Sequence, residues 1–260
     1  MIRKMLRPVK RACLRAVMPW HDPAHYLRQS VFRQSKMRVL EGPFAGMAYV
    51  ESAVGSAFFP KLVGAYEKEL HGVIEAACAR RPKVIIDVGA AEGYYAVGMA
   101  LKNPQARVIA FEMNPDGRAL IAQLAEINGV ARRIEVRGKC EPEDLLAAVA
   151  EGVGSETLMI CDVEGYEMEL FTPETARQLA GVCVLMETHD VLIPGCAEAV
   201  RKVMAATHDI QDVRTRERVA ADFPLVTFRC RLASAAVRAR MLAEWRAGPM
   251  TFFWMTPRKK

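Results

Sequence analysis

Long apolar runs, paired cysteines and internal repeats are all missing from this sequence of 260 residues. No apolar run approaches the roughly 20 residues that a membrane-spanning helix needs. The seven cysteines include no CxxC pair and form an odd count, which argues against a zinc site and favours reduced thiols in a cytoplasmic protein. Because no repeat or low-complexity segment interrupts the chain, we expect one large α/β domain with extra elements.

Acidic residues are nearly absent from residues 1–40, which contain ten lysines and arginines and one aspartate. This segment has a net charge of +9, so the other residues carry −3 of the total of +6. The positive charge therefore lies outside the expected catalytic domain, which argues against a nucleic-acid partner. Residues 1–20 have apolar side chains near helical spacing between basic ones. They are predicted to form either an amphipathic helix in peripheral contact with an anionic membrane or a plain basic terminus.

From residue 83 onward, short apolar runs alternate with segments of helical period. The predicted strands are 84–88, 107–112, 133–137, 157–162 and 182–187, and the helices between and after them are 92–102, 115–128, 141–151, 165–180 and 195–206. Alternation of this kind indicates parallel strands joined by right-handed crossovers, with helices on both faces. The predicted fold class is doubly wound, mostly parallel α/β.

The segments outside this alternation are assigned from their local patterns. Residues 1–80 are interpreted as a basic N-terminal segment followed by accessory or lid elements, with one helix over 60–80, and residues 81–260 as the main domain. The C-terminal strand candidates are DIQDV, LVTFRC and MTFFWMT, with a helix over 235–246. The last run is expected to add antiparallel to the sheet.

Residues 83–97, KVIIDVGAAEGYYAV, place a glycine-containing turn between a buried strand and a helix. Gly89 and Gly93 let the backbone approach a ligand, and the helix start offers unpaired N–H groups to a carboxylate or phosphate. The dehydrogenase fingerprint GxGxxG needs a glycine where Ala91 stands. The turn therefore favours a zwitterionic ligand, with Asp87 ordering the loop or meeting an ammonium group, over a pyrophosphate. A purely structural turn is the alternative.

Four acidic residues stand at the ends of predicted strands: Asp87, Glu112, Asp162 and Glu187. The carboxyl ends of parallel strands face one edge of a sheet, where ligands bind, so we expect these acids to converge on one crevice. The carboxylate of Glu112, on the strand after the glycine turn, is placed to accept both ribose hydroxyls of an adenosine.

Three segments, IIDVGAAEGYYA, DVEGYEMELF and LMETHD, resemble the FkbM family of S-adenosylmethionine-dependent methyltransferases, and the resemblance covers about residues 62–190. It implies a Rossmann-like class I methyltransferase domain with S-adenosylmethionine as the cofactor. The implied cofactor-binding residues are Asp87, Gly89, Ala90 and Gly93 in the methionine loop, Glu112 and Met113 at the ribose, Cys140 and Glu141 near the adenine, and Asp162 beside the reacting methyl.

His189 is the best candidate for the base that removes a proton from the methyl acceptor, with Asp162 and Glu187 as alternatives. A surface or capping histidine is the competing interpretation. The same three residues with Asp190 could instead gather Mg²⁺ or Mn²⁺, but spacing alone does not show that they converge, so the sequence assigns no metal ligand.

The function predicted from the sequence is S-adenosylmethionine-dependent O-methylation of a small-molecule acceptor. The resemblance suggests a hydroxyl of a sugar or secondary metabolite. The alternatives are an NAD-dependent oxidoreductase and a non-catalytic cofactor-binding module that acts through its basic N-terminus. The sequence does not identify the acceptor or the oligomeric state.

Overall fold

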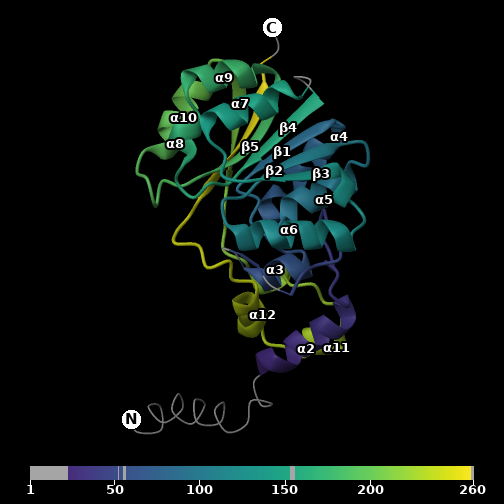
Figure 1. Ribbon diagram of the computed structural model, residues 1–260. Helices are drawn as coiled ribbons and strands as arrows, with labels where there is room; N and C mark the ends of the chain where they lie inside the picture. The colour runs from purple at the N-terminus through teal and green to yellow at the C-terminus, as the bar shows by residue number, and fades with distance from the viewer. Residues whose placement is uncertain (1–22, 52, 55–56, 153–155, 259–260) are drawn as a thin grey trace, which may run out of the picture.

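The computed structural model describes residues 23–51, 53–54, 57–152 and 156–258 (Figure 1). Residues 1–20, for which an amphipathic helix is one prediction, lie outside this part. The described chain contains a seven-stranded sheet in the order β3-β2-β1-β4-β5-β7-β6. Strands β1 to β5 are parallel, and β7 runs antiparallel to both β5 and β6. This arrangement confirms the predicted doubly wound, mostly parallel α/β fold, which is Rossmann-like.

The strands match the predicted apolar runs within one or two residues. Their bounds are β1 Val84–Val88, β2 Arg107–Phe111, β3 Ile134–Arg137, β4 Thr157–Cys161, β5 Cys183–Thr188, β6 His208–Arg214 and β7 Thr251–Pro257. The predicted antiparallel addition of the last strand is confirmed, because β7 pairs with β5 in the register Leu185 to Trp254. All five residues of β1 are buried, as expected for a central parallel strand covered on both faces.

Helices cover both faces of the sheet. The α-helices are α2 Pro23–Ser35, α3 Phe58–Val63, α4 His71–Ala79, α5 Tyr94–Lys102, α6 Pro115–Ile127, α7 Pro142–Ala150, α8 Glu167–Leu170, α9 Pro173–Gln178, α10 Cys196–Met204, α11 Phe228–Leu232 and α12 Ala235–Met241. The 3₁₀ helices are η2 Lys68–Leu70, η3 Ala131–Arg133, η5 Leu179–Gly181 and η6 Ala220–Asp222.

Two hydrophobic cores lie on the opposite faces of the sheet because successive strand side chains point to opposite sides. Ile85 of β1 belongs to the core that includes α4, α5 and α6. Its neighbour Ile86 belongs to the core that includes α7, α9 and α10. Asp87 follows on the same face as Ile85, and it lies at the carboxyl end of the strand. The period of the strand thus directs one acidic side chain into the interior at the edge where ligands bind.

The prediction of one helix over residues 60–80 is wrong. The chain forms α3, η2 and α4 instead, and α3 ends at Gly64, which has a left-handed φ of 75°. A Cβ atom at this position would lie 1.9 Å from the carbonyl oxygen of Glu41. Close packing of the two backbones therefore requires glycine and ends the helix, although the apolar period continues through it.

The predicted helix over 165–180 is divided into α8 and α9. Thr172 caps α9 by accepting a hydrogen bond from the N–H of Thr175, and Pro173 occupies the first turn. A proline restricts the residue before it to extended conformations, so the helix restarts at this point.

The strand predicted for LVTFRC is also wrong, because residues Phe228–Leu232 form α11. The Thr227 hydroxyl caps this helix through the N–H of Cys230 and is 2.8 Å from the hydroxyl of Ser30 in α2. The predicted helix over 235–246 ends at Met241. Tertiary contact with α2, together with the threonine cap, outweighs the β-branched composition of this segment.

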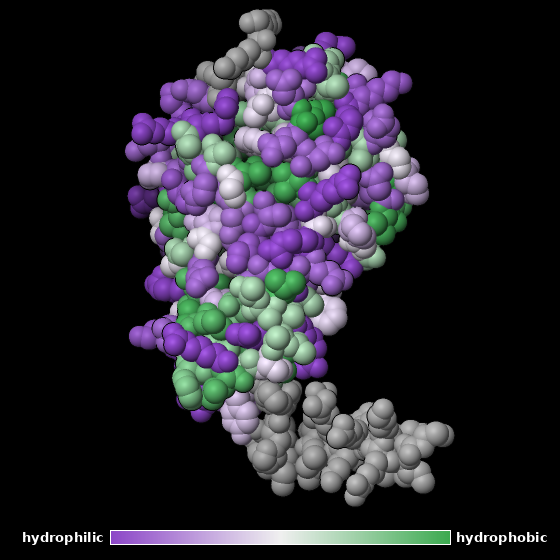
Figure 2. Space-filling model, turned by 180° about the vertical axis from the view of Figure 1, so that it is seen from behind, coloured by the Kyte–Doolittle hydropathy of each residue, from purple (hydrophilic) through white to green (hydrophobic). Residues whose placement is uncertain are grey.

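Helices α2, α11 and α12 pack together at the end of the molecule away from the strand-covering helices α7 and α9 (Figure 1). Figure 2 shows apolar residues gathered at this end, whereas on the same face of the molecule hydrophilic residues predominate over the α/β body. The exposed apolar side chains of α2 and α11 are Tyr26, Phe32, Phe228 and Leu232. None of the described helices combines the length and apolar character required to cross a membrane.

Candidate active site

A cavity of about 700 Å³ opens at the carboxyl edge of the sheet. Its walls come from the ends of β1, β2, β4 and β5, from Tyr66 and Glu67 before η2, and from residues 244–247 before β7. The four strand-end acids all line it: Asp87, Glu112, Asp162 and Glu187. The structure therefore brings together the groups that the strand pattern predicts at one edge.

The glycine turn forms one wall of the cavity. Gly89 has a φ of 83°, and a Cβ atom there would lie 1.7 Å from the carbonyl oxygen of Asp162. Gly89 is therefore required first for packing the turn against the end of β4. Oδ2 of Asp87 is buried and accepts no hydrogen bond from the described residues. Burial, assisted by the negative charge of Asp162, raises the pKa of Asp87 to about 7.

Glu112 connects the turn to the start of the next crossover. Its Oε2 accepts a hydrogen bond of 2.7 Å from the N–H of Ala91, and its Oε1 accepts one of 2.7 Å from the N–H of Asn114. Each carboxylate oxygen has two acceptor sites, so both retain capacity for a ligand hydroxyl. A Cβ atom at Gly117 would lie 2.8 Å from the Cγ atom of Glu112, so glycine leaves room for this carboxylate.

Some of the other residues predicted to bind the cofactor line the cavity, and some do not. Ala90, Met113 and Cys140 line the cavity, and Met113 is exposed at its rim. Gly93 does not line it. Gly93 has a φ of 94° at the start of α5, where a Cβ atom would lie 3.3 Å from the Cα atom of Ile121, so glycine is required there for packing against α6.

Glu141, also predicted near the adenine, lies outside the cavity wall. It accepts a hydrogen bond of 2.6 Å from the hydroxyl of Tyr166 and pairs with Lys139 at 2.7 Å. Lys139 and Tyr166 themselves line the cavity, and the Lys139 ammonium lies 4.4 Å from the centre of the Tyr166 ring. Glu141 therefore orders two wall residues, Lys139 and Tyr166, whose place in the cavity the sequence does not predict.

A buried ion pair behind the glycine turn was also not identified from the sequence. Glu92 has no exposed surface, and its carboxylate receives Nζ of Lys61 at 2.5 Å, the hydroxyl of Tyr49 at 2.5 Å and the N–H of Val54 at 3.1 Å. Burial raises the pKa of Glu92, but the charge of Lys61 and these hydrogen bonds outweigh it, so the net pKa is lowered. Glu92 thus links Tyr49, Val54 and Lys61 to the glycine turn.

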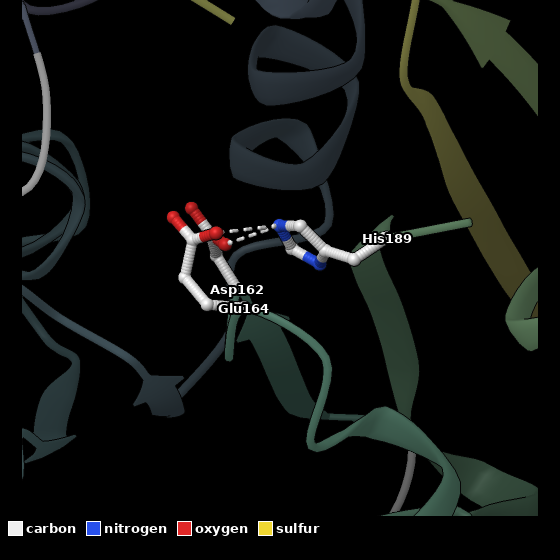
Figure 3. A group of neighbouring side chains, drawn as sticks. All are labelled: Asp162, Glu164 and His189. Atoms are coloured by element: carbon white, nitrogen blue, oxygen red, sulfur yellow. Dashed lines mark ion pairs between the residues drawn. The ribbon is translucent and has the colours of Figure 1, made fainter. Parts of the chain in front are cut away.

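His189 lies directly after β5 and is 2% exposed. Its Nδ1 lies 2.5 Å from Oε1 of Glu167, which is fully buried. Its Nε2 faces Oδ1 of Asp162 and Oε2 of Glu164, each at 3.4 Å (Figure 3). Burial lowers the pKa of His189, but the hydrogen bond to Glu167 and the nearby carboxylates outweigh it and raise the net pKa. His189 is therefore held by one carboxylate and directed at two others.

Glu164 and Glu167 belong to the DVEGYE segment, whose sequence pattern predicts no separate role for either residue. Glu164 has a left-handed φ of 51°, which is rare for a residue with a side chain. Glu167 is the first residue of α8, and it also accepts the N–H of Gly165 at 3.2 Å. The turn itself therefore places both carboxylates around the histidine.

Glu187, an alternative base in the sequence analysis, is paired with the guanidinium of Arg246. Arg246 also contacts Glu67 at 2.6 Å, so it joins the end of β5 to the accessory elements. Burial, with the charges of Asp162 and Glu67, raises the pKa of Glu187.

Asp190 is directed away from His189. Its carboxylate accepts the N–H groups of Gly195 and Ala197 at 3.1 and 3.2 Å, so it caps the start of α10. It does not join the group that faces His189.

No protein-family model matches the chain. Over 127 residues it is 33% identical to the release factor glutamine methyltransferase of Cereibacter sphaeroides, a match that covers 49% of this chain and 41% of the relative. Over 115 residues it is 30% identical to the catechol O-methyltransferase of Sus scrofa, covering 44% and 60%. The chain thus spans about half the length of the curated relatives it matches.

Among solved structures, the O-methyltransferase from Bacillus cereus in complex with SAH aligns over 96% of this chain and 97% of its own, at 10% identity and a TM-score of 0.49. Both curated relatives are methyltransferases. The chain is therefore similar to methyltransferases over nearly half of its own length.

Proposed function

We propose that the protein is an S-adenosylmethionine-dependent methyltransferase of the FkbM family that methylates a hydroxyl of a sugar or secondary metabolite. The observation that carries the proposal is the placement of the glycine turn, Glu112 and Asp162 around one cavity at the carboxyl edge of the sheet. Similarity to two curated methyltransferases supports the reaction class. The FkbM family and the acceptor class rest on the resemblance of the glycine-turn and DVEG segments.

The residues of the cavity suit the two ends of this cofactor. Buried Oδ2 of Asp87 lacks a hydrogen-bond donor among the described residues, and the ammonium group of a methionine moiety would supply one. Glu112 retains acceptor capacity for the ribose hydroxyls, and Met113 and Tyr166 provide apolar surface for the adenine.

When bound, S-adenosylmethionine supplies an electrophilic methyl group on a sulfonium. The protein must then align an acceptor oxygen behind that methyl group and accept the proton of the hydroxyl. Asp162 and His189 lie on the cavity wall at the ends of β4 and β5. With Nδ1 of His189 held by Glu167, Nε2 is directed at the cavity side. We assign activation of the acceptor hydroxyl to Asp162 and His189.

Calorimetry with S-adenosylhomocysteine tests the cofactor assignment. The Glu112→Ala variant should bind it at least about 10-fold more weakly, because it loses hydrogen bonds from the ribose hydroxyls to a charged group, each worth about 1.5–3 kcal/mol. Glu126→Ala is the matched control, since Glu126 is exposed on α6. Its affinity should equal that of the unmodified protein.

Two results would contradict the proposal. The first is tight binding of NAD without binding of S-adenosylhomocysteine, which would favour an oxidoreductase. The second is cofactor binding with no transfer of labelled methyl to any member of a broad library of sugars and hydroxylated metabolites, which would favour a non-catalytic module.

A further inference from the structure

Two strand ends and one strained turn direct three ligand atoms toward the same point. Asp162 follows β4, Glu164 lies two residues later, and His189 follows β5. One atom from each side chain can be chosen so that all three lie within 4.8 Å of one another. Figure 3 shows the two carboxylates together, facing the imidazole. The group is a mixed set of one nitrogen and two carboxylates.

The imidazole is held in the tautomer that suits a metal ligand. Nδ1 lies 2.5 Å from the carboxylate of buried Glu167, which can only accept, so neutral His189 has its lone pair on Nε2, facing Asp162 and Glu164. The second oxygen of Glu167 receives the thiol of Cys196 at 3.4 Å, so this carboxylate is itself fixed. A histidine that ligates a metal almost always donates its other N–H to a carboxylate, a carbonyl or water in this way.

His189 is the group that the ion pairs of Asp162 and Glu164 share. Within residues 23–258, apart from the short gaps in the description, neither Asp162 nor Glu164 forms an ion pair with lysine or arginine. Oδ1 of Asp162 is buried and accepts no hydrogen bond there. Two carboxylates facing an imidazole lone pair repel one another unless a proton or a cation lies between them.

The distances are compatible with a cation between the three side chains. Nε2 lies 3.4 Å from each carboxylate oxygen, longer than the 2.7–3.2 Å of an ordinary N–H···O hydrogen bond. Ligand atoms about 2.1 Å from a divalent cation lie roughly 3.0–3.4 Å apart at angles between 90° and 110°. The observed separations fall at the upper end of that range.

We propose that Asp162, Glu164 and His189 bind one divalent cation, with Glu167 as the group that orients the histidine. Mn²⁺ fits the donors best, because carboxylates suit hard cations whereas imidazole favours transition metals over Mg²⁺. Three protein ligands leave other coordination positions open toward the cavity. Binding of the ion stands by itself, whereas its part in methyl transfer rests on the proposed function.

In that reaction the acceptor hydroxyl would occupy an open position of the cation, which lowers the pKa of the hydroxyl. Its proton would pass to solvent, the oxygen would form a bond to the methyl carbon, and the carbon–sulfur bond would break to release S-adenosylhomocysteine. His189 then serves as a metal ligand, which replaces its role as the base.

Electron paramagnetic resonance with MnCl₂ tests the site on the full chain, stripped with a chelator, dialysed and free of cofactor. The protein should bind one Mn²⁺ and remove the signal of the free aquo ion. Glu164→Gln should weaken binding at least tenfold, and Glu167→Gln by about 10- to 100-fold. Glu169→Gln is the matched control, because Glu169 is exposed on the same segment, and it should bind Mn²⁺ normally. Glu164 is 69% exposed at its side chain, so Glu164→Gln should fold.

Absence of Mn²⁺ binding, or equal binding by the Glu164→Gln and Glu169→Gln variants, would overturn the proposal in favour of a protonated His189. Calorimetry with S-adenosylhomocysteine in excess EDTA separates this failure from failure of the proposed function. Mn²⁺ binding without cofactor binding would leave the metal site and reject the methyltransferase. Cofactor binding without Mn²⁺ binding would reject the metal site and leave the proposed methyltransferase function.

Discussion

Replacing Lys61 by methionine should show how much the buried ion pair with Glu92 stabilises the folded protein. The substitution leaves the fully buried carboxylate of Glu92 without its cation, while Tyr49 and Val54 still donate hydrogen bonds. Breaking a buried pair by removing one partner costs about 3–5 kcal/mol. At roughly 2 °C per kcal/mol for a chain of this size, the melting temperature should fall by about 6–10 °C.

Lys83→Met is the matched control. Lys83 pairs with Glu156 at 2.8 Å, but the two side chains are 64% and 37% exposed. An exposed pair contributes less than about 1 kcal/mol, so this variant should melt within about 2 °C of the unmodified protein. Scanning calorimetry at pH 7 compares the two. Equal melting temperatures for the Lys61→Met and Lys83→Met variants would refute the assignment of a large energy to the buried pair.

The pH dependence of the same difference provides an independent check. The folded pKa of Glu92 is lowered, so the pair stabilises the protein above the unfolded value of about 4.3 and loses this effect as the pH falls through the folded pKa. In the Lys61→Met variant, buried Glu92 can take up a proton instead of remaining charged. The difference in melting temperature should therefore be larger at pH 7 than at pH 4.5. A difference in melting temperature that increases as the pH falls would contradict the assignment of a charged Glu92 paired with Lys61.

Two further stability predictions follow from single positions. Burial lowers the pKa of His208, and its Nε2 lies 2.9 Å from the carbonyl of Val182, so its contribution is present above pH about 6.5 and lost as the pH falls through the folded pKa. In denaturant unfolding below about pH 6.5, His208→Gln should reduce the slope of the free energy of unfolding against pH. A slope equal to that of the unmodified protein would contradict this. Gly64→Ala should lower stability far more than Gly46→Ala, because both have positive φ but only Gly64 meets backbone, the carbonyl of Glu41 at 1.9 Å. Equal losses of stability in the Gly64→Ala and Gly46→Ala variants would show that the positive φ alone, and not the contact with Glu41, causes the loss.

The strand pattern could be predicted because each central strand is buried on both faces and reads as a continuous apolar run. The position of Asp87 and Glu112 at strand ends then follows, since parallel strands share one carboxyl edge. The accessory region could not be predicted in the same way. The apolar period of residues 60–80 continues through Gly64, and only contact with the backbone of Glu41 ends the helix there.

The partners of the site residues lie at distances in sequence that no local pattern covers. Lys61 and Glu92 are 31 residues apart, His189 and Glu167 are 22 apart, and Arg246 and Glu67 are 179 apart. Each pairing depends on how helices and loops pack against the sheet. The DVEGYE segment indicated an important turn, but the role of Glu164 emerges only where β5 brings His189 against it.

Local periodicity and strand direction are enough to predict the order and type of the sheet elements, the glycine turn and the acids at the strand ends. Which charges meet depends on how separate elements pack. The tertiary structure pairs Glu187 with Arg246, directs Asp190 to the start of α10, and sets Asp162 and Glu164 opposite His189. Charged side chains form pairs only when separate elements bring them within a few ångströms of each other. Those distances are set by the packing of both hydrophobic cores.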